Sequence, residues 1–238
     1  MSDPGNIATK PKKPKKLGPP KFDLATPHGR RGANRDLVWG DHGFLRTAFQ
    51  NLHWISAEMA RANQPSPKQI ARYAEMGIKT IINLRGVSNT GYYMLEKEAC
   101  AAHGLDLVDL RMFSREPPRR ETLLEARAMF ETIAYPAVMH CKSGADRAGL
   151  GAALYMHLRQ GQPIEQAMQQ LSLKYLHVRQ GKTGMLDHFF QCYLDETAES
   201  GKPFMQWVEE DYDRAKVKAS FMSSWWANVL VDNILRRE

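Results

Sequence analysis

The sequence has few cysteines and no long apolar run. Its three cysteines, at positions 100, 141 and 192 of 238 residues, are too few and too widely spaced for a disulfide framework or a four-ligand zinc site. No stretch of about eighteen apolar residues occurs, and residues 1–10 lack the apolar segment of a secretory signal. We therefore expect a cytoplasmic protein with no membrane span, no metal and no cofactor.

Acidic residues are scarce at the beginning of the chain. Residues 1–36 carry nine lysines and arginines but three aspartates, and so hold six of the seven net positive charges of the protein. A tail rich in lysine and proline favours disorder. Because the charge is local to this tail, we expect no nucleic-acid partner. Two interpretations stay open: a solvated tail, or a tail that holds the protein peripherally on the anionic inner face of a membrane.

Strand-like and helix-like patterns alternate through the middle of the chain. Short apolar, β-branched runs at 78–84, 105–112 and 137–140 are followed by helical patterns at 92–103, 120–134 and 148–160. This alternation predicts an α/β fold, with a central, mainly parallel sheet of about four to five strands flanked by helices, and ligands at the carboxyl ends of the strands. We expect a disordered basic tail at 1–36, one domain at 37–198 and a C-terminal helical extension at 199–238.

A cysteine stands six residues before an arginine at the junction between a predicted strand and a predicted helix. Between Cys141 and Arg147, Gly144 lets the backbone turn without a clash at Cβ. Unpaired amides at a helix N-terminus can cradle an anion and stabilise a thiolate. The guanidinium of Arg147 can bind two phosphate oxygens and bind them more tightly as charge grows in the transition state. The pattern predicts a nucleophilic cysteine in a phosphate-binding loop.

The segment His140–Arg147, with His-Cys-x5-Arg at this junction, resembles the protein tyrosine phosphatase superfamily. Residues 64–66, 77–86 and 114–115 are similar to bacterial members of its dual-specificity branch, so the resemblance extends over residues 52–195. It implies a phosphatase-like fold and a cysteine-dependent phosphatase, in which Cys141 forms a phosphocysteine and Arg147 binds substrate. The residues expected to bind substrate with it are Lys142, Ser143, Gly144, Ala145, Arg85, Ser114 and Arg115.

The general acid does not stand where the resemblance places it. In this superfamily the acid is usually an aspartate in the loop after the preceding strand, but residues 113–118 contain none. Asp146, inside the phosphate loop, is the favoured acid, with Glu116 and Asp109 as alternatives. Ala148 also replaces the serine or threonine usual after the arginine. This replacement implies slow hydrolysis of the phosphocysteine, and leaves open a pseudophosphatase that binds phosphorylated partners.

The substrate class stays open at this stage. Clustered arginines near the loop suit a multiply anionic substrate, either a phosphorylated protein or a phospholipid or inositol phosphate. Residues 220–237 predict an amphipathic helix in which Met222, Trp225, Trp226, Val229 and Leu230 share one face. That face would pack on the domain or on a second subunit, or insert at a lipid interface, where tryptophan is favoured.

Overall fold

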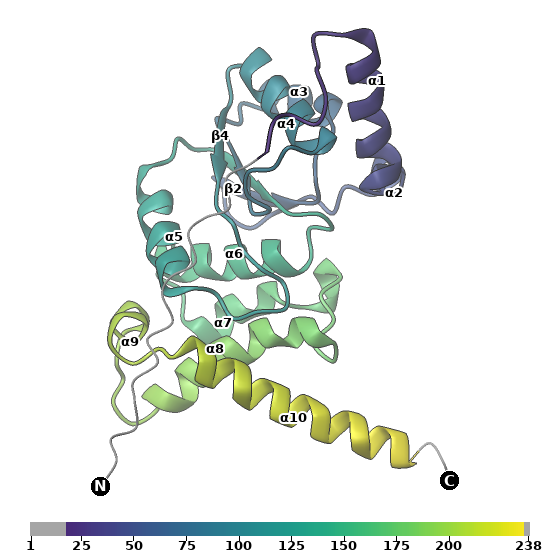
Figure 1. The fold of residues 1–238 in the computed structure, drawn as a ribbon. Helices are drawn as coiled ribbons and strands as arrows, with labels where there is room; N and C mark the ends of the chain where they lie inside the picture. Colours follow the sequence, from purple (N-terminus) through teal and green to yellow (C-terminus); the bar gives the residue numbers. More distant parts are fainter. Residues whose placement is uncertain (1–17, 236–238) are drawn as a thin grey trace, which may run out of the picture.

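The computed structural model describes residues 18–235, and the side chains of all of these except residues 47–48 and 226–235. Its centre is a five-stranded sheet in the order β1-β2-β5-β3-β4 (Figure 1). The last four of these strands run parallel, and β1 pairs antiparallel with β2. The predicted α/β fold is confirmed. The strands are β1 His53–Trp54, β2 Met59–Ala62, β3 Thr80–Asn83, β4 Asp106–Asp109 and β5 Ala137–His140.

Helices cover both faces of the sheet. Successive strand residues point to opposite faces, so Ile82 and Met139 enter the core beneath α5 and α6, whereas Ile81 and Val138 pack with α3 and α4. Both apolar faces are therefore removed from water, as parallel sheets require. These helices are α3 Pro67–Glu75, α4 Gly91–Ala102, α5 Arg120–Thr132 and α6 Asp146–Leu158.

The helix α3 begins at a capping box. The Ser66 hydroxyl accepts a hydrogen bond from the Gln69 amide at 3.4 Å, and the Gln69 side chain accepts one from the Ser66 amide at 2.7 Å. Each residue satisfies a donor that the helix start would otherwise leave unpaired. A serine directly before a helical segment is a typical helix start, and Ser66 has that role here.

The prediction of a disordered tail over residues 1–36 is wrong for residues 27–35. Residues 27–35 form the helix α1 (Pro27–Arg35), followed by a π-helical turn at Asp36–Gly40 and by α2 (Gly43–Ala48). A Cβ on Gly91 would lie 2.5 Å from the Ala33 carbonyl oxygen, so α1 rests closely on α4. The composition of this segment did not predict the helix, because few of its residues are apolar and only Gly29 and Ala33 are buried. The lysines at 10–16 lie outside the described residues.

The C-terminal segments belong to the same core. The short helix α7 (Ile164–Ala167) does not continue, because Leu171 leaves the helical backbone region, and short 3₁₀ turns lead to α8 (Met185–Thr197). The ring of Phe189 lies 6.1 Å from that of Phe204 and 5.9 Å from that of Trp207. The helix α9 (Phe204–Glu210) is thus an integral part of the domain, rather than an outlying extension.

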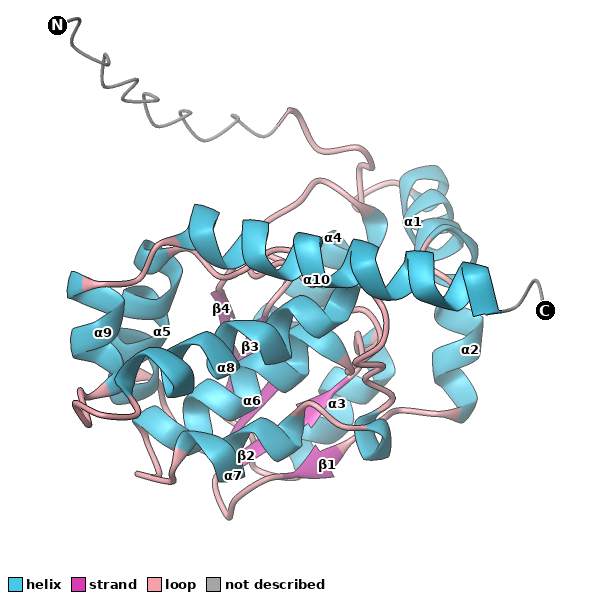
Figure 2. Ribbon diagram, turned by 90° about the horizontal axis from the view of Figure 1, so that it is seen from below, coloured by secondary structure: helices cyan, strands magenta, loops and turns pink. Residues whose placement is uncertain are grey.

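The last helix, α10 (Arg214–Leu235), confirms the predicted C-terminal helix. It packs on α8 and then runs past it, so that its end projects on the side of the molecule where α2 lies (Figures 1 and 2). Trp225 is half-buried, and the side chains of Trp226, Val229 and Leu230 lie outside the described set. Within residues 18–235, no helix combines the length and apolarity needed to cross a membrane.

Candidate active site

The phosphate loop leaves the central strand of the sheet. It runs from Cys141 to Ala145, directly after β5 and directly before α6. Because β2 and β3 lie on either side of β5, residues that follow these strands surround the loop. Cys141 is 1% exposed, so its thiol stands at the bottom of the loop rather than on the surface.

Four successive carbonyl groups of the loop are held outward. The Lys142 carbonyl accepts a hydrogen bond from the Gln64 amide at 3.3 Å, and the Ser143 carbonyl accepts one from the Asn51 side-chain amide at 3.0 Å. One guanidinium nitrogen of Arg61 donates to the carbonyls of both Gly144 and Ala145, at 2.8 Å each. Turning the carbonyls away from the centre turns the peptide N–H groups toward it.

These inward N–H groups are available to a ligand. In the part of the chain that the structure describes, the amides of Ser143 and Gly144 have no protein acceptor, and that of Ala145 has a 3.4 Å bond to the Ser143 hydroxyl. The first turn of α6 adds its own unpaired amides and the positive end of its dipole. Such a set of convergent donors is an anion site.

Gly144 is required by both conformation and space. Its φ of +75° is a value that residues with a Cβ rarely adopt. A Cβ would lie 2.8 Å from the backbone at Ala62 and Asn63 and 2.9 Å from the Asn51 side chain. The loop therefore contacts the segment after β2 backbone to backbone.

Arg61 is the central support of the loop. It is fully buried on β2. Burial lowers its pKa to about 10, although the charges of Cys141 and Asp146 act to raise it. Its second terminal nitrogen donates to the Gln170 carbonyl at 2.6 Å, and its guanidinium stacks 4.1 Å from the centre of the Tyr175 ring. At neutral pH it is a cation that spans two segments of the chain and fixes the loop between them.

A second buried charge cluster borders the loop on its other side. Asp41 accepts two hydrogen bonds of 2.7 Å from Arg85 and one of 2.8 Å from Arg46, and lies 3.6 Å from the ammonium of Lys142. Burial raises the pKa of Asp41, but its bonds to Arg85 and the charges of all three cations outweigh this and lower it. Three cations around one carboxylate leave a surplus of positive charge at the loop.

Arg85 is placed differently from the sequence-based prediction. Besides Asp41, it donates to the Gln64 side chain at 2.8 Å and lies 3.6 Å from the centre of the Tyr92 ring. Burial lowers its pKa, while the Asp41 carboxylate and the charge of Cys141 raise it, for a net increase. Its guanidinium fork is therefore occupied, and it supports the loop from behind.

Arg147 differs from these arginines. It is half-buried in the first turn of α6, and among the described residues its guanidinium has neither a hydrogen-bond partner nor an ion-pair partner. An uncommitted planar fork beside a ring of free amides matches the geometry of a phosphate dianion.

His140 and Glu96 form a buried pair beneath the loop. The His140 Nε2 lies 2.5 Å from a carboxylate oxygen of Glu96, and both side chains are fully buried. The other Glu96 oxygen accepts a 2.9 Å bond from Gln64, which also donates its backbone amide to the loop. This pair ties α4 to the residue before Cys141.

Asp146 faces a histidine that sequence reasoning did not select. The His177 Nδ1 lies 2.9 Å from Asp146 and its Nε2 lies 2.7 Å from Asp187, which also accepts a bond of 2.9 Å from Arg179. Burial lowers the pKa of His177, but the two carboxylates outweigh burial, and the net effect raises the pKa to about 9. The imidazolium orients the Asp146 carboxyl, whose side chain keeps 24% exposure.

The two alternative acids have other partners. Asp109 accepts 2.7 Å hydrogen bonds from Asn83 and from Tyr93, one at each carboxylate oxygen. Glu116 pairs with Arg214 and Lys218 of α10, at 3.1 Å and 2.6 Å. Ser114 is half-buried and Arg115 is exposed, and among the described residues no hydrogen bond or ion pair joins either of them to the phosphate loop.

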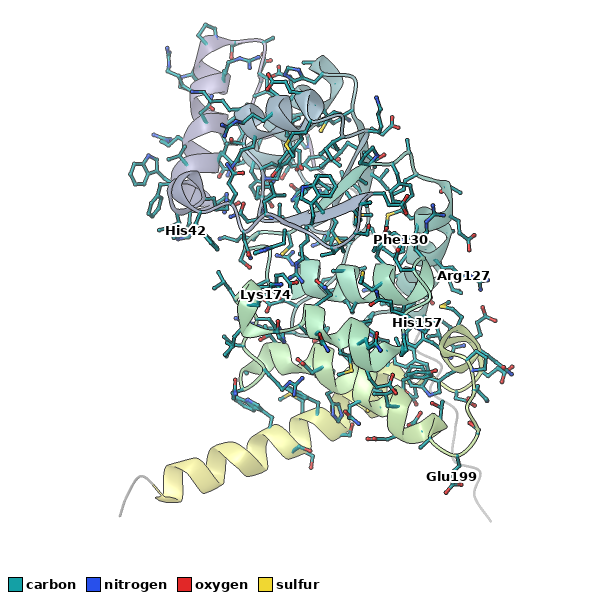
Figure 3. The ribbon with its side chains drawn as sticks, turned by 180° about the vertical axis from the view of Figure 1, so that it is seen from behind. His42, Arg127, Phe130, His157, Lys174 and Glu199 are labelled. Atoms are coloured by element: carbon teal, nitrogen blue, oxygen red, sulfur yellow. The ribbon has the colours of Figure 1, made fainter. Side chains whose placement is uncertain are left out.

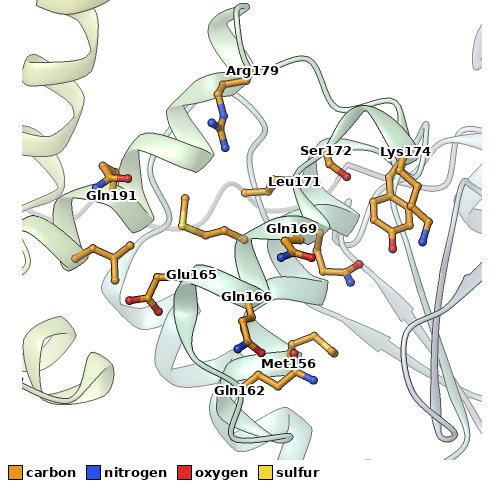
Figure 4. A pocket seen from close by; sticks show the side chains of 14 residues that line it. Met156, Gln162, Glu165, Gln166, Gln169, Leu171, Ser172, Lys174, Arg179 and Gln191 are labelled. Carbon is orange, nitrogen blue, oxygen red and sulfur yellow. The ribbon is translucent and has the colours of Figure 1, made fainter.

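A groove of about 880 Å³ lies beside the site between α7 and α8 (Figure 4). Glutamines dominate its lining, and Cys141 and Arg147 are not part of it. Gln170 and Tyr175 line the groove and also contact Arg61. The groove therefore adjoins the supports of the loop, while the reacting atoms lie elsewhere.

Comparison with known proteins places this site in a family. The sequence model of the tyrosine phosphatase family matches residues 56–216. No curated protein matches the chain. Among solved structures, P. aeruginosa TpbA is 19% identical and has a TM-score of 0.48, over 60% of this chain and 84% of that one. The catalytic domain of the PP-IP phosphatase SIW14 from S. cerevisiae is 14% identical and has a TM-score of 0.49, over 64% and 93%. For PTPMT1 the values are 15% and 0.47, over 63% and 99%.

The fit around Gly144 leads to a first prediction. Gly144→Ala is expected to add about 1–2 kcal/mol of backbone strain, to displace the loop, and to weaken binding of inorganic phosphate roughly 100-fold. Calorimetric titration and thermal unfolding measure the two effects. Gly161→Ala is the matched control, because Gly161 has a φ of +67° but no atom within 4 Å of its Cβ position. Equal loss of phosphate binding in both variants would contradict the steric argument.

The pairing of His177 predicts a pH dependence of stability. Its pKa of about 9 in the folded protein exceeds the ordinary histidine value of 6.5. The two ion pairs therefore stabilise the fold fully below about pH 6.5, and the stabilisation is lost as the pH rises through about 9. In urea unfolding between pH 6.5 and 9, the free energy of unfolding of His177→Gln should decrease less with pH than that of wild type. His28→Gln, at an exposed position, should show the wild-type decrease. An unchanged slope in His177→Gln would assign the dependence to other groups.

Proposed function

Because the chain belongs to the tyrosine phosphatase family, we propose that it hydrolyses phosphomonoesters through a phosphocysteine formed on Cys141. The chain is a phosphoric monoester hydrolase. The observation that carries the mechanism is the outward orientation of the four carbonyls from Lys142 to Ala145. In the proposed mechanism, the loop amides and the free fork of Arg147 bind the phosphate next to the thiol.

The proposed reaction has two displacements. The Cys141 thiolate attacks phosphorus, the bond to the leaving oxygen breaks, and Asp146 gives that oxygen a proton. A water molecule then gives a proton to the Asp146 carboxylate as it attacks the phosphocysteine, and the sulfur–phosphorus bond breaks, which releases inorganic phosphate and restores both the thiolate and the acid. In both transition states Arg147 and the loop amides bind the three non-bridging oxygens, where the negative charge gathers.

Three buried guanidinium groups lie close enough to Cys141 to interact with its charge. Burial lowers the pKa of Arg46, Arg61 and Arg85 individually, and the charge of Cys141 opposes that decrease in each of them. Together these three guanidinium groups add positive charge around the loop, which would attract an anionic substrate.

Asp146 is the acid that the geometry supports best. It begins α6 within the phosphate loop, it remains partly exposed, and its contact with His177 fixes its orientation. The carboxylates of Asp109 and Glu116 are each engaged with other residues. A loop acid that precedes the arginine removes the need for an aspartate on residues 113–118.

Ala148 favours slow turnover of the intermediate. Its side chain is completely buried in α6 and has no hydroxyl to assist departure of the thiolate from phosphorus. The phosphocysteine should therefore persist longer than the first step takes. In the limit of very slow hydrolysis the protein would act as a phosphate-binding pseudophosphatase, which is the second candidate function.

The substrate is proposed to be a phosphorylated protein, in the tyrosine or dual-specificity sense, or a lipid or inositol phosphate. The surplus of positive charge around Asp41 supports a substrate with more than one anionic group. We place the protein in the cytoplasm, where the lysine-rich tail and α10 would bring it to an anionic membrane face.

Substitution of the nucleophile tests the function. Cys141→Ser should abolish hydrolysis of para-nitrophenyl phosphate, because a hydroxyl replaces the thiolate, while binding of inorganic phosphate persists. Cys192→Ser is the control, since Cys192 lies half-buried on α8 and contacts His188. A wild-type protein that binds phosphate without turnover supports the pseudophosphatase. An initial burst of nitrophenol followed by a slow steady state would locate the slow step after phosphocysteine formation.

The role of Asp146 has a distinct kinetic signature. Asp146→Asn should slow hydrolysis of alkyl phosphates, which need a proton on the leaving oxygen, roughly 100-fold more than that of nitrophenyl phosphate. A plot of rate against leaving-group pKa measures this difference. Glu116→Gln should leave the slope of the plot unchanged. Equal rate losses for all leaving groups in Asp146→Asn would remove it from the role of acid.

A further inference from the structure

Exposed apolar side chains gather around the site. Eleven large apolar residues are exposed in the described part of the chain, and seven of them occur in two short segments, residues 39–49 and 173–178. We call these seven the apolar rim. Soluble proteins rarely expose large apolar patches unless a partner covers them. The members of the rim are Trp39, Phe44, Leu45, Phe49, Leu173, Leu176 and Val178.

The first segment of the rim contacts the phosphate loop, and the second contacts residues next to the loop. In the first segment, His42 lies 3.3 Å from the ammonium of Lys142. In the second, the Tyr175 carbonyl accepts a 3.2 Å bond from Asn51, and His177 contacts Asp146. Figure 3 shows His42 and Lys174 on the same side of the molecule. The apolar rim therefore flanks the mouth of the site.

The exposed charges among the rim residues are positive. Between Glu165 and Asp187 there is no acidic residue, whereas Lys174, Arg179 and Lys182 are exposed. Between Asp36 and Glu58 the one acid is Asp41, which is buried and paired. Apolar side chains interspersed with cations, and without exposed anions, match the surface of an anionic bilayer.

The helix α10 continues this surface. The ammonium of Lys182 lies 5.2 Å from the centre of the Trp225 ring, where α10 passes the second rim segment. From there its backbone projects on the same side as α2 and His42 (Figures 1 and 3). Two separate rim segments and a helix thus border one face, and a deformable bilayer can meet all three at once.

We propose that the apolar rim inserts into an anionic membrane and seats a lipid headgroup phosphate in the loop below. The substrate class is then a phosphomonoester on a membrane lipid. This inference rests on the proposed phosphatase activity for its substrate, but the membrane contact itself is independent of catalysis. It selects lipid over protein among the substrates that the loop could accept.

The test compares two double variants of the full chain. Leu45→Ser with Leu173→Ser changes one leucine in each rim segment, at residues 62% and 71% exposed. Met76→Ser with Leu124→Ser, which are exposed elsewhere, is the matched control. Sedimentation uses phosphatidylcholine vesicles with and without about 20% phosphatidylserine. Wild type and control should bind the anionic vesicles equally, and the rim variant about tenfold more weakly.

Activity separates the membrane contact from the chemistry. All three proteins should hydrolyse para-nitrophenyl phosphate equally, whereas the rim variant should lose about tenfold in rate on phosphatidylinositol phosphate in vesicles, but not on a soluble short-chain form. The proposed membrane contact is wrong if wild type does not bind anionic vesicles, or if the rim variant and the control variant bind them equally. Self-association or phosphopeptide binding that only the rim variant loses would assign the face to a second copy or to a protein. If wild type does not hydrolyse nitrophenyl phosphate, the proposed activity itself is refuted.

Discussion

The outward pull on four consecutive carbonyls is the constraint on which the rest of the site depends. A loop of this curvature can turn either its carbonyls or its amides toward the centre, and only the second arrangement attracts an anion. The donors that decide this come from Asn51, Arg61 and Gln64, all close to β1 and β2 rather than from the loop itself. The chemistry of Cys141 thus depends on residues that lie about eighty positions earlier in the chain.

The arginines around the loop differ in how far their guanidinium groups are engaged by other residues. Arg46, Arg61 and Arg85 are engaged by carboxylates or carbonyls and serve as fixed supports, whereas Arg147 is left uncommitted. A buried cation whose terminal nitrogens donate several hydrogen bonds holds its position, and an uncommitted one can follow the changing geometry of a reacting phosphate. The same side-chain type therefore performs two tasks, and its partners determine which.

The sheet, most helices and the loop between β5 and α6 could be predicted from the sequence, because each depends on local pattern: apolar runs of strand length, the helix start at Ser66, and the spacing of Cys141 and Arg147. The sequence alone did not identify Asn51, Arg61, Asp41 or His177. Their roles arise from contacts across long sequence separations, and nothing local marks them. A signal existed for Arg61, since a charged residue within the small, apolar run of β2 must have a buried partner. The missed helix α1 has a similar cause, because its burial depends on a distant glycine, Gly91.

The position of Arg61 on β2 makes the pocket sensitive to the fidelity of strand pairing. In a strand, a slip of one residue against the neighbour sends every side chain to the opposite face. Arg61 pairs with Met139 of β5 in the native register, and its guanidinium reaches the loop only from that face. A compact intermediate with the right strands in the wrong register would be folded in outline yet unable to hold a phosphate. Anion binding is therefore acquired with the final alignment of the sheet, and a bound phosphate would favour that alignment over its neighbours.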